Sequence, residues 1–186
     1  GQLLAMSFRT KTIREITEMI CGNSPEGEHG FRYRTGSELI DFFSDCGLDA
    51  SALASGGLSR AGWSAQAVSE LSAKPSIQEG MPSQQFCNMI RYLMDIEDAV
   101  VTDDCFDPNR ELALARLNKA LSREGLEAFF GDDRVCYLRN TASGLVAKSG
   151  VVPARALTLE EKEKQCALAN YLDTASEDEI TENVIL

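Results

Sequence analysis

Apolar residues recur at helical spacing in five segments of the chain. In the first segment Ile13, Ile16 and Ile20 fall on one helical face. The second has the clearest start, because Thr35 and Glu38 have the spacing of a capping box. A serine or an aspartate precedes each of the other three, where a side-chain oxygen caps a helix. Helices are therefore predicted from Arg9 to Cys21, from Thr35 to Gly47, from Ser59 to Lys74, from Ser83 past Met94, and from Asp107 to Gly125.

The pattern changes after the fifth helix and predicts a β-hairpin. Residues 126–130 and 135–138 are short runs of β-prone side chains, and residues 131–133, Gly-Asp-Asp, favour a turn between them. A helix followed by a hairpin resembles the last helix and wing of a winged-helix domain, with Arg134 and Arg139 near the wing.

The C-terminal part of the chain is more polar. Residues 145–152 are a candidate third strand, and capping-box spacing at Thr158 and at Ser176 predicts a charged helix and the start of another. The predicted fold class is α+β and mostly helical, with about five core helices, a hairpin and a C-terminal helical connector. The predicted divisions are a disordered start with a tag remnant (1–7), a helical recognition domain with the hairpin (8–152), and a charged helical connector (153–186).

Composition and charge exclude several classes of protein. The chain has 186 residues, enough to build a core without disulfides or a metal. Its 18 Lys and Arg stand against 29 Asp and Glu, and the net charge of −11 disfavours indiscriminate binding to nucleic acid or anionic lipid. No apolar run is long enough to span a membrane. The six cysteines include no Cys-x-x-Cys pair, so we predict free buried thiols and a cytoplasmic location.

The sequence offers little chemistry for catalysis. The single histidine, His29, lies in a glycine-flanked loop, which leaves nucleophile-and-base pairs almost no room. Glu160, Glu161 and Lys162 match the Glu-x-Lys of a metal-dependent nuclease, but they fall in the first turn of a predicted helix, where acids favour the helix dipole. The carboxylates near Asp103 lack the ligand order of an EF-hand. We therefore predict no enzymatic activity, no cofactor and no metal site.

One group of residues points to binding. Arg9, Lys11 and Arg14 lie on the first predicted helix, and Arg32 and Arg34 alternate with aromatic residues just before the second. Guanidinium forks with neighbouring rings suit phosphates and stacked bases. Alternation places Arg32 and Arg34 on one side of an extended segment. The alternative interpretation is that these five cations are ordinary surface charges paired with neighbouring carboxylates.

Four segments carry a resemblance to a known family. They are Phe-Arg-Thr-Lys-Thr-Ile-Arg-Glu-Ile-Thr-Glu-Met-Ile from residue 8, Tyr-Arg-Thr at 33–35 before Leu-Ile-Asp-Phe-Phe at 39–43, Ser-Arg-Ala-Gly-Trp at 59–63, and residues 114–126 running into the hairpin. In these segments the chain resembles the N-terminal domain of AbiJ-type abortive-infection proteins of bacteria. The resemblance implies a small helical module that precedes a separate effector, often a nuclease, in phage defence. It supplies no catalytic residues, and it agrees with the apolar end at Leu186, after which an effector would follow.

Three hypotheses follow for the function. The leading one is a non-enzymatic sensor or regulatory module of an antiphage protein, which controls a C-terminal effector in response to a phage-derived trigger or a nucleic acid. A first alternative is a winged-helix-like nucleic-acid-binding domain that uses the five cations named above. A second is a homo-oligomerisation module, in which Phe42, Phe43 and the helix around Met89 are partly exposed.

Overall fold

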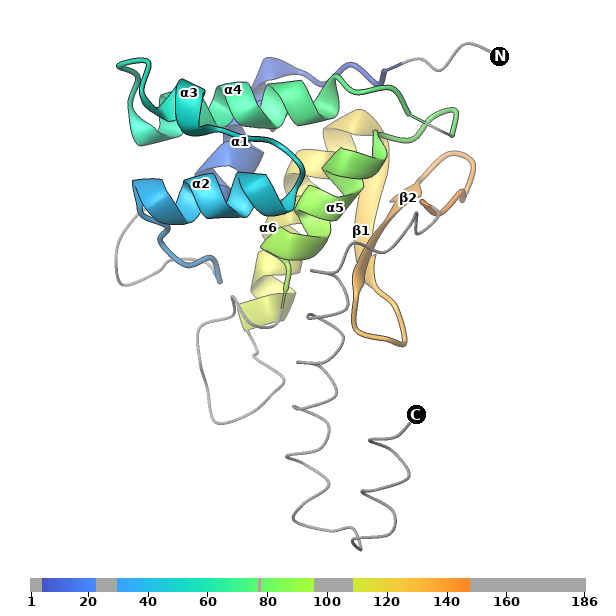
Figure 1. Cartoon of the computed structure of the whole chain (residues 1–186). Coiled ribbons are helices and arrows are strands. Elements are labelled where there is room, and N and C mark those ends of the chain that lie inside the picture. Colours follow the sequence, from blue (N-terminus) through green and yellow to red (C-terminus); the bar gives the residue numbers. More distant parts are fainter. Residues whose placement is uncertain (1–4, 23–29, 77, 96–108, 148–186) are drawn as a thin grey trace, which may run out of the picture.

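The computed structural model of the chain describes residues 5–22, 30–76, 78–95 and 109–147. These residues form six α-helices and one two-stranded antiparallel hairpin, which confirms the predicted α+β class. Figure 1 shows α3 and α4 across the top of the molecule and the hairpin beside α5 and α6. The elements are α1 (Thr10–Cys21), α2 (Gly36–Asp45), α3 (Ser51–Ala54), α4 (Arg60–Ser72), α5 (Gln84–Leu93), α6 (Asn109–Leu121), a 3-10 turn (Ser122–Glu124), β1 (Leu126–Phe130) and β2 (Cys136–Asn140).

Three helices begin with the caps that the sequence predicts. Thr35 and Glu38 form a reciprocal capping box at the start of α2. The hydroxyl oxygens of Ser59 and Ser83 accept backbone N–H groups three residues further along, at the starts of α4 and α5. Gly125 adopts a left-handed conformation with φ of 69° and separates the 3-10 turn after α6 from β1. Local sequence signals therefore set most of the element boundaries.

The helix α1 is capped at its start by a residue from the other end of the domain. No side chain of its own first turn caps it. The carboxylate of Glu124 accepts hydrogen bonds from the backbone N–H of Arg9, at 3.0 Å, and from the hydroxyl of Thr12, at 2.8 Å. An anion at this end also complements the helix dipole. The contact fixes α1 against the 3-10 turn that follows α6.

The core lies where α1 packs between α4 and α6 and where α5 meets α4 and β2. Phe43 meets Trp63 edge-on with ring centres 6.3 Å apart, and Phe8 stacks on Phe86 at 4.6 Å. The predicted partial exposure of Phe42, Phe43 and the helix around Met89 is wrong. Phe42 is 6% exposed, and Phe43 and Met89 are fully buried. These side chains form the contacts among helices and are not available as an oligomer surface.

The hairpin lays one face on the helices. Its buried positions are Leu126, Ala128, Cys136 and Leu138. The amide of Asn118 in α6 donates to the carbonyl of Ala128 at 2.9 Å and accepts from its N–H at 2.6 Å, so it pairs with β1 as a neighbouring strand would. The predicted third strand is represented among the described residues by a single antiparallel bridge from Val146 to Arg139.

Several sequence predictions fall on residues outside the described ranges. They concern His29, the acidic stretch around Asp103, the Asp107 cap, residues 148–152 of the third strand and the 153–186 connector. Among the described cysteines, Cys21, Cys46, Cys87 and Cys136 are free and buried, as predicted. Within the described helices, none is long and apolar enough to cross a membrane.

Candidate functional site

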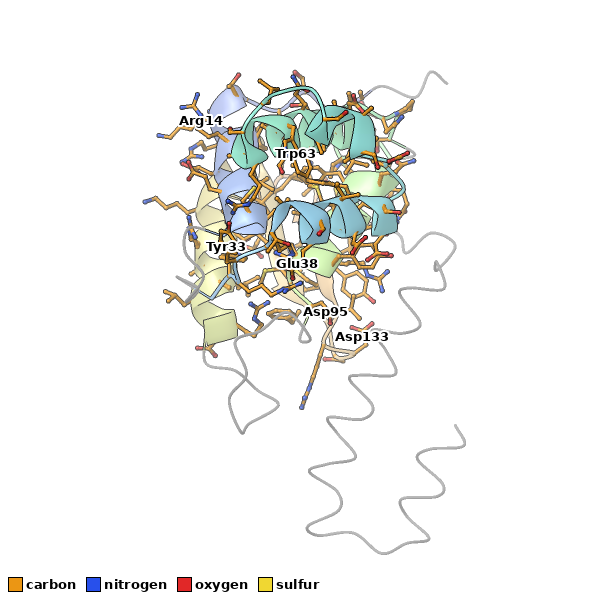
Figure 2. The ribbon with its side chains drawn as sticks, turned by 60° about the vertical axis from the view of Figure 1, so that its left-hand side comes forward. Arg14, Tyr33, Glu38, Trp63, Asp95 and Asp133 are labelled. Atoms are coloured by element: carbon orange, nitrogen blue, oxygen red, sulfur yellow. The ribbon has the colours of Figure 1, made fainter. Side chains whose placement is uncertain are left out.

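The structure divides the five candidate cations between the two ends of α1. Arg9, Lys11 and Arg14 lie at its start, whereas Arg32 and Arg34 belong to the segment that crosses its C-terminal end. The ten residue steps from Lys11 to Cys21 span about 15 Å of helix. Figure 2 shows Arg14 projecting from the start of α1, apart from Tyr33 and Glu38. The five residues therefore do not form one site.

The cations at the start of α1 lie on the surface, and Lys119 of α6 and Arg123 of the 3-10 turn lie near Lys11. Arg9, Lys11 and Arg14 are exposed. On α1, Glu15 accepts two hydrogen bonds from the guanidinium of Arg123, at 2.6 and 2.8 Å. This bond, with the nearby charges of Lys11 and Lys119, lowers the pKa of Glu15. The side chains of Lys11, Glu15, Lys119 and Arg123 thus form one continuous patch, the α1/α6 surface.

A groove runs on the other side of α1, between α1 and α4. Its volume is about 750 Å3, and Phe8, Ile13 and Arg14 line it from the α1 side. Small residues of α4, including Gly62 and Ala65, form the opposite wall. Because these side chains are short, the two helices leave an open trough that is mostly apolar.

Two guanidinium groups close the C-terminal end of α1. Arg34 donates to the carbonyl of Ile20 at 2.9 Å. Arg60, at the start of α4, donates to the carbonyl of Cys21 at 2.8 Å and to that of Arg34, also at 2.8 Å. The last carbonyls of a helix have no partners within the helix, and cations at this end complement its dipole. We call Arg34, Arg60 and the carbonyls that they bind the α1 clasp.

Aromatic rings and a glycine complete the α1 clasp. The guanidinium carbon of Arg34 lies 4.7 Å from the ring centre of Phe42, and that of Arg60 lies 4.1 Å from the ring centre of Tyr33. Gly22 has φ of 71°, and a side-chain carbon on it would approach the Cα of Tyr33 to 2.6 Å. The crossing segment therefore lies directly on the end of the helix, and only glycine permits this approach.

Arg32 and Arg34 face the same hollow, but carboxylates surround them. The hollow has a volume of about 410 Å3, and Glu38, Asp41 and Asp45 also line it. Arg32 forms an ion pair with Glu38 at 2.6 Å. Arg34 is 2% exposed, so its guanidinium belongs to the core. With two cations against three carboxylates, the hollow does not attract a polyanion.

Sequence reasoning missed the roles of the half-buried Arg60 and of two buried arginines, Arg91 and Arg110. Arg60 closes α1, Arg110 is 6% exposed and donates to the carbonyl of Gly30, and Arg91 is 8% exposed in the last turn of α5. No periodic signal could have found Arg60, because its acceptors lie about 26 to 39 residues away in the chain. The Ser-Arg-x-x-Trp pattern was the only feature that drew attention to it.

The described thiols are poor nucleophiles. Burial raises the pKa of Cys87 and of Cys136 to about 12, and it raises the pKa values of Cys21 and Cys46 as well. A thiol reacts as its thiolate, so these four groups are inert near neutral pH. In the part of the chain that the structure describes, no three His, Cys, Asp or Glu side chains are grouped as metal ligands.

Comparisons with known proteins do not assign the chain to a family. Family models, curated proteins and solved structures each give no match.

Proposed function

We propose that this chain is a non-enzymatic sensor or regulatory module of a bacterial antiphage protein, which controls a C-terminal effector. The resemblance to the N-terminal domain of AbiJ-type proteins supplies the biological setting. One structural observation supports the non-enzymatic part: the groups that could act chemically hold the fold together. Arg34 and Arg60 bind backbone carbonyls, and the thiols of Cys46, Cys87 and Cys136 are buried with raised pKa values.

Three of the four segments that carry the resemblance meet at the α1 clasp. Ser59 caps α4, the adjacent Arg60 reaches the end of α1, and Trp63 packs on Phe43. Arg60 also stacks on Tyr33, which belongs to a second of those segments. The spacing Ser-Arg-x-x-Trp thus has a physical reason in helix packing. The shared residues therefore have structural roles in the helix packing. Their roles support a scaffold that presents a recognition surface, and they give no support to an active site.

The first experiment tests the enzymatic alternative. The chain is incubated with labelled single- and double-stranded DNA and RNA and with Mg²⁺, and we expect no hydrolysis. Hydrolysis that disappears in Glu160→Gln would overturn the proposal, because the Glu-x-Lys match would then be functional. A Glu79→Gln variant is the matched control, since Glu79 is exposed and lies outside this match.

The second experiment tests regulation. In the full-length polypeptide, deletion of residues 8–152 should leave an effector whose activity no longer depends on infection. The readout is growth of bacteria that express either form, with and without phage. An effector that responds to phage equally well after the deletion contradicts the regulatory role.

A second candidate function is nucleic-acid binding through the α1/α6 surface. The observation that favours it is the joining of Lys11 with Lys119 and Arg123 from a distant part of the chain, near the exposed Arg9, whose backbone N–H donates to Glu124. The order of α6 and hairpin agrees with a winged-helix-like domain, in which that helix binds the groove.

Fluorescence anisotropy across a salt series tests this second function. Binding to phosphates weakens with salt in proportion to the contacts made, so Lys11→Ala with Lys119→Ala should flatten the slope by about two. Lys74→Ala, an exposed lysine beyond the end of α4, is the control. Binding that keeps its slope in the double variant, or no binding at low salt, excludes this surface. Arg34→Ala is unsuitable because it removes a core contact.

A further inference from the structure

Arg91 is a buried cation without a hydrogen-bonded partner among the described residues. It lies in the last turn of α5 and is 8% exposed. Its Nε has no acceptor, and no carboxylate is paired with it in the described ranges. A buried charge without a partner costs several kcal/mol, so natural proteins pair such groups or use them to bind a ligand.

The guanidinium of Arg91 lies in the corner between α5 and β2. Its central carbon is 5.9 Å from the ring centre of Tyr137 in β2. The charge of Arg91 acts on the thiols of Cys87, one turn earlier, and of Cys136, across the corner. Both thiols are neutral because burial raises each pKa to about 12, so they do not compensate the positive charge.

A second buried arginine faces the same corner. Arg110 of α6 is 6% exposed, and its charge also acts on the thiol of Cys136. Arg110 has contacts of its own, including the carbonyl of Gly30. Arg91 and Arg110, from different helices, therefore both lie close enough to Cys136 for their charges to act on its thiol.

The ring of Tyr137 forms a fixed wall beside Arg91. Its hydroxyl donates to the carboxylate of Asp133 in the hairpin turn. A side-chain carbon at position 131 would come within 2.8 Å of the Tyr137 ring, so Gly131 leaves the space that the ring occupies. Phe129 lies 6.0 Å away between ring centres. A hydrogen bond and a neighbouring ring therefore hold the Tyr137 ring beside Arg91.

We propose that Arg91 anchors an oxyanion site in this corner, which binds the phosphate or carboxylate of a small ligand. A guanidinium presents a planar fork of N–H donors that matches both groups. The ring of Tyr137, 5.9 Å from the guanidinium carbon of Arg91, bounds the site on one side. The inference goes beyond the proposed function and does not depend on it, because ligand binding is measured on this chain without an effector or a nucleic acid.

Thermal denaturation and titration calorimetry with defined anions test the site. The probes are inorganic phosphate, acetate and a nucleoside monophosphate, with chloride at equal ionic strength as the reference. A ligand that binds only the folded state raises Tm, by about 5 °C at a hundred times its Kd. Stronger binding of phosphate or of acetate identifies the oxyanion, and a further gain with the nucleotide shows that its ring contacts Tyr137. Responses to all three that equal the response to chloride would overturn the site.

Variants separate a ligand site from a structural role. Arg91→Met should lose the anion-dependent rise in Tm while folding normally, and Arg91→Lys should weaken anion binding at least tenfold, because an ammonium lacks the fork. Arg139→Met is the matched control, since Arg139 lies on the same strand over the ring of Phe129. A rise in Tm that survives in Arg91→Met overturns the proposal. So does a loss of stability in Arg91→Met without any anion, since Arg91 would then have a partner within the chain.

Discussion

The C-terminal ends of α1 and α5 use the same side chain in opposite ways. At the end of α1, Arg34 and Arg60 bind backbone carbonyls and lie against rings. At the end of α5, Arg91 is almost as deeply buried as Arg34, yet its Nε has no acceptor. Burial alone therefore does not tell what an arginine does. The partners of the guanidinium distinguish an arginine that holds two segments together from one whose Nε has no acceptor.

The difference follows from what crosses each helix end. The segment 31–35 passes over Gly22 so closely that Arg34 and Arg60 reach the last carbonyls of α1. Beside the last turn of α5, the described contacts of Arg91 are with a tyrosine ring and two neutral thiols, and its Nε has no acceptor. Guanidinium donors find carbonyl acceptors at the end of α1, whereas the Nε of Arg91 at the end of α5 does not. The following variants break or sharpen this contrast.

Arg34→Ala should have the largest effect. The substitution removes a buried bond to the carbonyl of Ile20 and the contact with Phe42, and it leaves a cavity. We expect the free energy of unfolding to fall by about 3–5 kcal/mol. Urea denaturation measures this change, and Lys74→Ala should stay within about 0.5 kcal/mol of the parent chain. A loss below about 1 kcal/mol for Arg34→Ala contradicts the structural role of the α1 clasp.

Arg60→Ala should have the next largest effect. It removes the bonds to the carbonyls of Cys21 and Arg34, but the site is half-buried, so water replaces part of the loss. We expect about 2 kcal/mol of destabilisation in the same assay. Arg60→Lys should recover less than half of it, because one ammonium cannot reach both carbonyls in the geometry of the fork. If Arg60→Lys is as stable as the parent chain, a positive charge alone is enough at the end of α1 and the forked hydrogen bonds are not needed.

Arg91→Met should change stability in the opposite direction or not at all. An apolar side chain of similar volume removes an unpaired charge from the interior. Such replacements are neutral or stabilising, and we expect a gain of about 0–2 kcal/mol in phosphate-free buffer. Set beside Arg34→Ala, this variant tests whether the two helix ends differ as described. Equal losses in the two variants would remove the contrast.

Glu15→Gln should have the smallest effect, and that effect should depend on pH. Arg123 lowers the pKa of Glu15 below its ordinary value of 4.5 in the folded protein. The ion pair therefore stabilises the fold above that ordinary value, and the gain disappears as pH falls through the lowered pKa. The pair is partly exposed, so we expect Glu15→Gln to lower Tm by about 1–2 °C at pH 7. The difference in Tm between Glu15→Gln and the parent chain should disappear in acid. A difference that grows in acid contradicts a stabilising Glu15–Arg123 ion pair.

Most elements were predictable because their signals are local. The capping box at Thr35, the serine caps at Ser59 and Ser83, and the left-handed Gly125 lie within a few residues of the helices or turns that they define. The short helix α3 was missed because it has four residues and none of them is buried, so it leaves no apolar period. The exposure of Phe42 and Met89 was misjudged because periodicity shows which face is apolar but not how many neighbours cover it.

The candidate site was predicted only in part. The alternation of Arg32 and Arg34 correctly placed both on one hollow, and the sequence correctly placed Lys11 on a helix. It could not show that Arg34 is buried, or that Lys119 and Arg123 lie beside α1. These facts depend on how α1, α4 and α6 pack, and contacts between distant segments leave no pattern along the chain.

By itself the sequence determined five of the six helices, the caps of α2, α4 and α5, the hairpin, the acidic balance and the inward placement of the four described cysteines. Each depends on the side chain itself or on neighbours a few residues away. Only the tertiary structure decided what each arginine does, because a guanidinium reaches acceptors far along the chain. Arg60 closes α1 and Arg91 is left without an acceptor for the same reason: the folded backbone brings carbonyls to one guanidinium and rings and thiols to the other.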